Sequence, residues 1–274
     1  MSTVPPFKGF AELVPAVETK RDYGLPSGDL AEQFLARANK LFSGELKGFP
    51  GLEGTLKLVS TDRGLELAGS NFPVLATMNL VDLDGLGIQL CDERDLARVY
   101  NDEVQRVAQG KQGFFQNRFW FDIALIRNPQ ASQTDLKPWE EELDREITSI
   151  CGDKDLVSVP YRAIVPVVLS RDNAPFGQLV GYSFRINPAM KSVVKSVEVT
   201  PCEAQEGYDF VRLNETTAFP VKGRGRHFYG ISANRRFSGL CMGRGLSASR
   251  YEYPLGSDEA GRVVVKSAEG TAQK

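Results

Sequence analysis

The sequence predicts an α+β fold built mainly on an antiparallel sheet. Three segments have the apolar spacing of helices, and shorter strand-like segments lie between them in an irregular order. Runs of strands separated by helices favour α+β, whereas a strict alternation would favour a parallel sheet. The 274 residues are 42% hydrophobic and 25% charged, which supplies a core for one large domain or two small ones.

The first half of the chain opens with an expected strand over 7–19, broken at Pro15. A helix is expected over 30–42, capped by Ser27 or Asp29, because its apolar residues recur at helical spacing. Residues 53–61 alternate polar and apolar side chains and are expected to form a strand.

Residues 65–90 are rich in apolar side chains but are interrupted by Gly, Asn and Pro. We expect a hairpin-like protrusion there, with Phe72, Val74, Leu75 and Met78 partly exposed. An exposed apolar hairpin would indicate a partner. A buried pair of strands is the alternative.

The second half contains the two clearest helices, over 91–111 and 136–151, the latter with Pro138 in its first turn. Between them, 116–128 has the nearly continuous apolar content of a central strand. Later segments are expected to be two strands joined by a turn (161–172 and 176–187), a strand or short helix (190–199), and a polar C-terminal tail.

The stretch Lys222–Arg250 is the most distinctive part of the chain. It holds seven cations and no Asp or Glu, although the whole protein has a net charge of −2. Glycines and the aromatic residues Phe228, Tyr229 and Phe237 alternate with the cations. Arginine matches phosphate oxygens, glycine permits close approach of the backbone, and aromatic faces stack on unpaired bases. The pattern predicts binding of single-stranded nucleic acid through a local patch.

Two plainer interpretations of the same stretch stay open. A run of Gly and Arg can be a solvated loop without a ligand. The loop can also bind acidic protein surfaces, which would make the chain an interaction module.

Other functional classes lack their sequence signals. The four cysteines are widely spaced, no CxxC pair occurs and there is one histidine, which argues against structural zinc. No nucleotide-binding glycine motif and no nucleophile elbow is found. The first residues lack the pattern of a signal peptide, and no segment has transmembrane length. We expect a cytoplasmic protein without a cofactor or metal.

A catalytic alternative rests on His227, the single histidine, which lies between Arg226 and Phe228. It could serve as the general base of a metal-independent endoribonuclease, with Tyr229 or an arginine assisting. Asp82 and Asp84 form a short acidic pair that is more typical of a turn than of a metal site. Cys241 lies near two arginines, but a packed thiol is the simpler interpretation.

Several segments in this order resemble one family: the backbone subunits that line the guide RNA in type I-F and type IV CRISPR effector complexes, within the repeat-associated RNA-binding superfamily. The segments are TKRD, EGTLKLVST, the insertion LAGSNFPVLATMNLVDL, the helix RDLARVYNDEVQRVAQG followed by FFQNRFWFDIAL, and PVKGRGRHFYGISANRRF. The helix followed by the Asn-Arg strand carries most of the resemblance. The chain looks shorter than type I-F subunits, which favours a type IV or reduced variant.

The resemblance implies an RRM-like antiparallel palm over 1–262, with a helical insertion at about 91–152 and a tail at 263–274. Residues 66–84 would form a thumb-like β-hairpin whose Phe72, Val74 and Met78 wedge between bases. Such a subunit is a non-catalytic protein that oligomerises head to tail along the guide RNA, beside other effector subunits, and the guide then pairs with target nucleic acid. The residues implied in RNA binding are Asn117, Arg118, Trp120, Lys222, Arg224, Arg226, His227, Arg235, Arg236 and Arg244. A nuclease role for Asp82 or Asp84 is a further, weaker implication.

Overall fold

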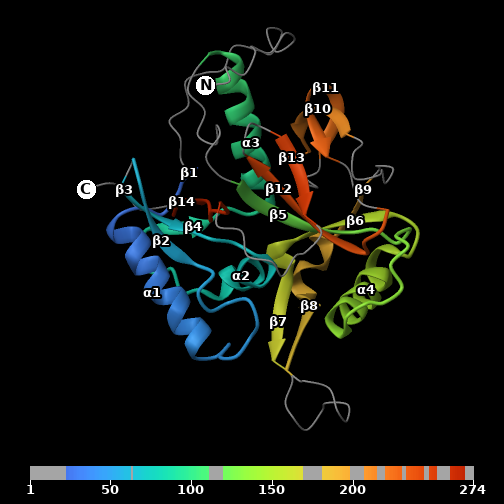
Figure 1. Ribbon diagram of the computed structural model, residues 1–274, viewed down its shortest axis with the longest axis horizontal. Helices are drawn as coiled ribbons and strands as arrows, with labels where there is room; N and C mark the ends of the chain where they lie inside the picture. The colour runs from blue at the N-terminus through green and yellow to red at the C-terminus, as the bar shows by residue number, and fades with distance from the viewer. Residues whose placement is uncertain are drawn as a thin grey trace.

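The computed structural model describes residues 23–62, 64–110, 120–168, 181–197, 207–214, 220–229, 233–243, 247–251 and 260–268. Within these ranges the chain is a mixed α+β protein (Figure 1). Its α-helices there are α1 (Asp29–Ser43), α2 (Phe72–Thr77), α3 (Glu93–Ala108) and α4 (Pro138–Cys151). None of the helices in the described ranges has the length and apolar content to cross a membrane.

A seven-stranded sheet organises the molecule, with the strand order β10–β11–β13–β12–β5–β6–β9. Neighbouring strands are antiparallel except for β11 and β13, which are parallel. The strands are β5 (Trp120–Arg127), β6 (Leu156–Pro160), β9 (Lys195–Val197), β10 (Gly207–Leu213), β11 (Pro220–Tyr229), β12 (Phe237–Gly243) and β13 (Ser247–Tyr251).

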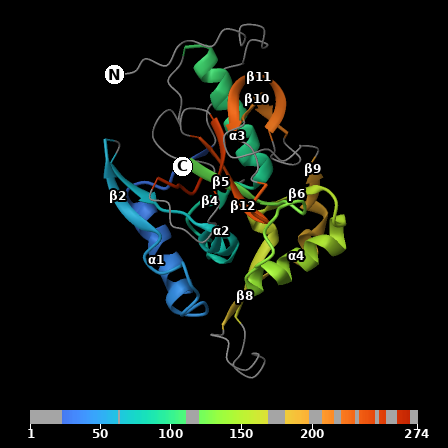
Figure 2. The same cartoon turned by 45° about the vertical axis from the view of Figure 1, so that its right-hand side comes forward.

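The described residues also form three smaller sheets. A three-stranded sheet has the order β1–β14–β4, and β2 with β3 and β7 with β8 form antiparallel pairs. Figures 1 and 2 show the β7–β8 pair extending from the body beside α4. The strands are β1 (Tyr23–Gly24), β2 (Lys57–Thr61), β3 (Gly64–Ala68), β4 (Ile88–Leu90), β7 (Ile164–Val168), β8 (Tyr182–Ile186) and β14 (Val265–Ser267).

Helices cover both faces of the sheet at its interior strand β5. Phe121 and Ile126 belong to one buried cluster with Val99 and Tyr100 of α3. Leu125 belongs to a second cluster with side chains of α2 and α4. The nearly continuous apolar sequence of β5 follows from this arrangement, because a strand buried on both faces needs apolar side chains on both.

Polar side chains define where α3 and α4 begin. The Asp92 Oδ1 atom accepts hydrogen bonds from the backbone N–H groups of Arg94 and Asp95, both at 2.9 Å, at the start of α3. At the start of α4, the Glu140 carboxylate accepts a bond of 2.8 Å from the backbone N–H of Lys137.

The expected helices and most expected strands are confirmed in the described ranges. Residues 190–199, expected as a strand or a short helix, contain both: the 3₁₀ helix η4 (Pro188–Val193) followed by β9. The expected cap of α1 is wrong, since Gly28 occupies the N-cap position and no side chain caps the helix. The expected strand at 7–19 lies outside the described residues.

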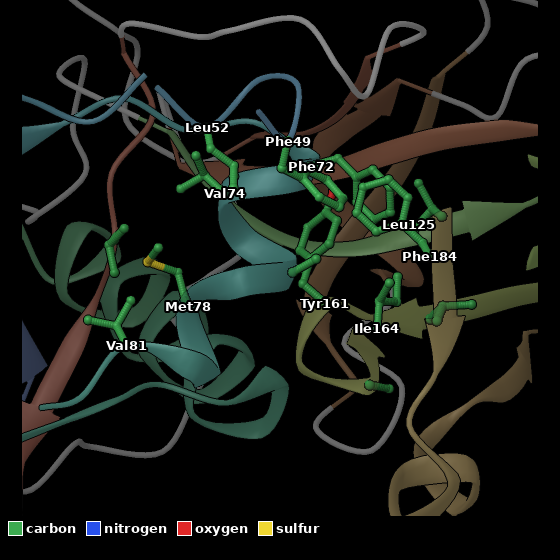
Figure 3. Close-up of a cluster of buried hydrophobic side chains, with 14 of the residues drawn as sticks. Phe49, Leu52, Phe72, Val74, Met78, Val81, Leu125, Tyr161, Ile164 and Phe184 are labelled. Carbon is green, nitrogen blue, oxygen red and sulfur yellow. The ribbon is translucent and has the colours of Figure 1, made fainter. Parts of the chain in front are cut away.

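The expectation of an exposed hairpin at 66–84 is wrong. After β3 the segment forms α2 and the short 3₁₀ helix η1 (Met78–Leu80), and Phe72, Val74 and Met78 are buried (Figure 3). Asn71 caps α2 by accepting a bond of 2.9 Å from the Val74 N–H. These three side chains therefore form core contacts and cannot wedge between bases.

Phe72 lies in the middle of an aromatic cluster. Its ring centroid is 4.3 Å from that of Phe184 and 5.4 Å from that of Trp139. The ring centroid of Tyr161 lies 5.8 Å from that of Phe72. The Gly, Asn and Pro residues that suggested a hairpin instead build the turn and the cap before a short helix.

Two domain boundaries also need correction. The polar tail cannot begin at 263, because Val263, Val264 and Val265 are buried and β14 pairs with both β1 and β4. The range 91–152, expected as a helical insertion, is not helical throughout, because it contains β5, which lies inside the seven-stranded sheet.

Candidate nucleic-acid interface

The basic stretch Lys222–Arg250 is built into the sheet. It contains most of β11 and β13 and all of β12, and these strands are neighbours in the order β11–β13–β12. The interpretation of this stretch as a solvated loop is therefore wrong for its described strands. Cations on strands have a fixed backbone spacing of about 3.3 Å per residue, which a loop does not provide.

The register places the end of β11 at the same level as the start of β5, with β13 and β12 between them. Phe228 pairs with Ala248, Ala248 with Met242, and Met242 with Phe121. One residue further along, Gly243 pairs with both Ser247 and Trp120. The sheet thus places the end of the histidine-containing strand, the end of β12, the start of β13 and the beginning of the predicted Asn-Arg strand at one level along the strands.

Trp120 marks that end of β5. Its side chain is half-buried. Its backbone N–H donates to the Ala260 carbonyl over 3.1 Å, and its backbone carbonyl accepts from the Arg262 backbone N–H over 2.8 Å. Of the neighbours implied in RNA binding, Asn117, Arg118 and Arg244 lie outside the described residues.

The Gly-Arg-Gly run at 223–225 forms an irregularity in β11. Lys222 and Arg226 both have Phe210 of β10 as their partner, so the three residues between them have no partner of their own in the register. A bulge of this kind bends a strand and re-aims its residues, and it is frequent at sheet edges and near functional sites. For Lys222, Arg226 and His227 the structure describes the strand and its register, and for Arg224 it describes the strand.

Arg235 and Arg236 lie at the opposite end of the sheet. They precede Phe237, which pairs with Arg127 at the end of β5. Phe228, Ala248 and Met242 form one row of paired residues across the sheet. Arg226 lies two residues from this row on one side, and Phe237 lies five residues from it on the other side. The two positions are therefore separated by about 23 Å along the strands. Arg224 with Arg226 and Arg235 with Arg236 therefore form two separate groups, and Arg250, which pairs with Leu240, lies between them along the strands.

Arg236 has a structural role in this second group. Its Nη1 donates to the Pro129 carbonyl over 3.0 Å, and its backbone N–H donates to Oε1 of Gln133 over 3.1 Å. Its Nε is buried without a hydrogen-bond partner. The guanidinium is therefore partly committed to the loop after β5, which limits the donors it can offer to a phosphate.

His227 has Asp209 of β10 as its partner in the antiparallel register. Sequence reasoning missed Asp209, because 207–213 was not assigned to an element. The alternation of apolar and polar residues in GYDFVRL is the signal that indicates a strand there. The single histidine thus has a carboxylate residue at the facing position.

Asp82 and Asp84 form a turn closed by arginine. The Asp82 Oδ1 atom accepts from the Asp84 N–H over 3.0 Å, and Arg37 Nη1 donates to the backbone carbonyls of both aspartates, at 2.9 and 2.5 Å. No group of three or more metal-ligating side chains is found in the described part of the chain. The geometry is that of a turn held against α1.

A small cavity of about 60 Å³ lies apart from the basic strands, between η1, the start of α3 and β5. It has room for a few water molecules. Its charged side chains are paired: Arg162 contacts Glu93 through two hydrogen bonds, and Ser70 Oγ donates to Asp122 over 2.6 Å. The bond to Glu93 raises the pKa of Arg162. These groups fix the fold and form no basic surface.

Comparison with protein-family models, with characterised proteins and with solved structures found no match for the chain.

Proposed function

We propose that this chain is a non-catalytic RNA-binding subunit that oligomerises along a guide RNA. One observation carries the proposal: a stretch with seven cations and no acid supplies three neighbouring strands of the main sheet. The net charge of −2 means that binding must come from this patch and not from the charge of the whole protein.

The chemistry of the patch suits a nucleic-acid backbone. Arginine binds phosphate oxygens with a planar fork, and such contacts are independent of sequence and weaken with salt. The glycines on both sides of Arg224, in a part of β11 without paired partners, favour close approach of a ligand. Phe228 and Tyr229 supply aromatic residues for stacking on single-stranded bases.

The proposal includes the finer elements implied by the family resemblance: an RRM-like palm, head-to-tail contacts between copies, other effector subunits and pairing of the guide with target nucleic acid. Since Phe72, Val74 and Met78 are buried, a wedging element must lie elsewhere. The antiparallel pair β7–β8 is the better candidate, because it extends from the body (Figure 1) and Val168, the last residue of β7, is 54% exposed.

The first test is the absorbance ratio at 260 and 280 nm and the mass of the full chain purified at low salt, before and after ribonuclease treatment. We expect a large particle that carries RNA and becomes shorter after treatment. An oligomer that carries no nucleic acid and stays intact after nuclease treatment would favour the interaction module. A monomer that also ignores added single-stranded RNA would overturn the proposal.

A second candidate function is a metal-independent endoribonuclease with His227 as the general base. The observation that favours it is the register pair of His227 and Asp209, because a carboxylate next to an imidazole can orient it and favour its protonated form. The test is cleavage of labelled RNA in EDTA by the wild-type chain, His227→Ala and Asp209→Asn. Cleavage by the wild type that is lost in both variants supports the endoribonuclease. If the wild type does not cleave RNA, the result supports the non-catalytic binding subunit.

A further inference from the structure

A side chain of α3 holds the backbone of strand β10. The Leu213 N–H donates to Oδ1 of Asn101 over 2.8 Å, and Nδ2 of Asn101 donates to the Leu213 carbonyl over 3.1 Å. A side-chain amide offers an acceptor and a donor side by side, as the backbone of a neighbouring strand does. Asn101 therefore takes the place of a neighbouring strand at this residue of β10, which is the last strand in the order of the seven-stranded sheet.

The helix that carries Asn101 is fixed to the core. Val99 and Tyr100 are fully buried and belong to the same apolar cluster as Leu213. Two residues after Asn101, the buried Glu103 accepts a hydrogen bond of 2.8 Å from the Tyr23 hydroxyl through its Oε1 atom. These contacts give the Asn101 side chain a fixed position, and Figures 1 and 2 show α3 beside β10 and β11.

The pair β10–β11 is attached to the rest of the molecule at two levels. At one end Leu213 pairs with Pro220, the first residue of β11, so the contact with Asn101 lies at this level. At the other end Phe228 of β11 pairs with Ala248 of β13, and this is the one pair that joins the two strands in the described register.

The cations of β11 lie between these two attachments. Lys222, Arg224 and Arg226 all belong to the strand between Pro220 and Phe228. Because residues 223–225 have no partner of their own in the register, the position of this part of β11 depends on the paired residues on both sides of it. A strand that is held at one level alone can pivot about that level.

We propose that Asn101 is a positioning residue for RNA, an inference that rests on the RNA binding proposed above. By holding Leu213, Asn101 fixes the end of β10–β11 that lies away from β13, and so sets where the cations of β11 stand relative to the rest of the sheet. Groups that are held in place before a ligand arrives lose less freedom on binding, which increases affinity.

The neutral side chain of Asn101 separates positioning from a purely structural role. The slope of log K against log salt concentration reflects the number of phosphates that the protein neutralises. Asn101 neutralises none, so its removal changes the slope only if it moves cations away from their phosphates. A loss of stability alone leaves the slope unchanged while the protein stays folded.

The test compares the full-length wild type with Asn101→Ala, and the matched control is Asn39→Ala. Asn39 is exposed inside α1, so both variants replace a helical asparagine by the best helix former. Fluorescence anisotropy measures binding of single-stranded RNA at several salt concentrations. Amide hydrogen exchange, resolved at single residues without RNA, follows Leu213, and protection of the β5 amides shows that each variant is folded.

We expect Asn101→Ala to bind RNA about fivefold more weakly than the wild type, because its cations are no longer held in place. Its salt slope should flatten by about 0.7 for each phosphate contact that is lost. The Leu213 amide should exchange about tenfold faster, since its acceptor has been removed. The control should match the wild type in affinity, slope and exchange.

The results distinguish this inference from the proposed function. If the wild type binds RNA and Asn101→Ala has the same salt slope, the positioning role is overturned, even where Leu213 exchanges faster. Unchanged exchange of Leu213 would overturn the contact itself and the inference with it. A wild type that does not bind RNA would overturn the proposed function and also this inference.

Discussion

Arg127 Nε donates a hydrogen bond of 2.7 Å to Asp144 Oδ1, although the arginine side chain is only 2% exposed. The same guanidinium donates to the Thr148 hydroxyl over 2.8 Å and to the Gly152 carbonyl over 3.0 Å. One side chain at the end of β5 thus binds the middle and the end of α4. This pairing fixes the helix on the face of the sheet next to the start of β12.

Replacing Arg127 by Met should lower the free energy of unfolding by about 3 kcal/mol, because it leaves the half-buried Asp144 and the Gly152 carbonyl without their donor. Urea unfolding followed by circular dichroism measures the change. Arg145→Met is the matched control, since Arg145 is exposed on the same helix. Equal stability of the two variants would show that the buried contacts contribute nothing net.

Replacing Phe72 by Ala should cost about 3–5 kcal/mol, the usual range for removing a buried aromatic side chain. Its ring is fully buried among Trp139, Tyr161 and Phe184. Thermal and urea unfolding should both report the loss. Val168→Ala, at an exposed position, should stay within about 0.5 kcal/mol of the wild type. A Phe72→Ala variant as stable as this control would mean that the segment around α2 is not part of the core.

Helical periodicity predicted α1, α3 and α4 because each has one apolar face, and such a face depends on local sequence alone. Phe72 shows where this reasoning fails. In a short segment with Gly, Asn and Pro, the choice between an exposed hairpin and a buried helix depends on Trp139 and Phe184, which lie far away in the sequence. No local pattern contains that information.

In the candidate interface, too, some features could be predicted from the local sequence and others could not. The absence of acids from 222–250 was visible in the sequence, but not its incorporation into three neighbouring strands. The pairing of His227 with Asp209, and the separation of Arg226 from Arg236, follow from strand register. Register is set by turns and by packing against the rest of the sheet.

The ion pair between Lys266 of β14 and Asp95 of α3 should make stability depend on pH. Burial of the Asp95 carboxyl opposes its ionisation, but the bond of 2.7 Å from Lys266, the Asp92 N–H and the nearby positive charges outweigh burial and lower the pKa of Asp95. A carboxyl with a lowered pKa in the folded state contributes stability above its unfolded pKa. That contribution is lost as the pH falls through the folded value.

We therefore expect Lys266→Met to reduce stability at neutral pH and to flatten the loss of stability on the acid side. The measurement is the unfolding free energy in urea between about pH 2 and pH 7 for both proteins. Glu142, whose pKa is also lowered despite its burial, remains in both and supplies the residual slope. An unchanged slope in Lys266→Met would show that the pair does not couple protonation to folding. The pKa of Lys266 is raised in the folded protein. The stability that this residue contributes is therefore lost on the alkaline side, as the pH rises through its folded pKa.

The proposed RNA binding predicts a specific salt dependence. Arg224→Ala/Arg226→Ala should weaken binding to single-stranded RNA by a similar factor for unrelated sequences, because phosphate contacts carry no sequence information. A plot of log K against log salt concentration should flatten by about 0.7 for each phosphate that is no longer neutralised, or about 1.4 for the double variant. Filter binding or fluorescence anisotropy at several salt concentrations measures the slope.

The control is Arg94→Ala/Arg145→Ala, which removes the same charge from exposed positions on α3 and α4. Its slope should equal that of the wild type, since the two residues lie off the basic strands. If both double variants flatten the slope equally, binding follows overall charge and not the strands. If neither does, Arg224 and Arg226 do not bind phosphate, and the group at Arg235 and Arg236, about 23 Å away along the strands, becomes the next to test.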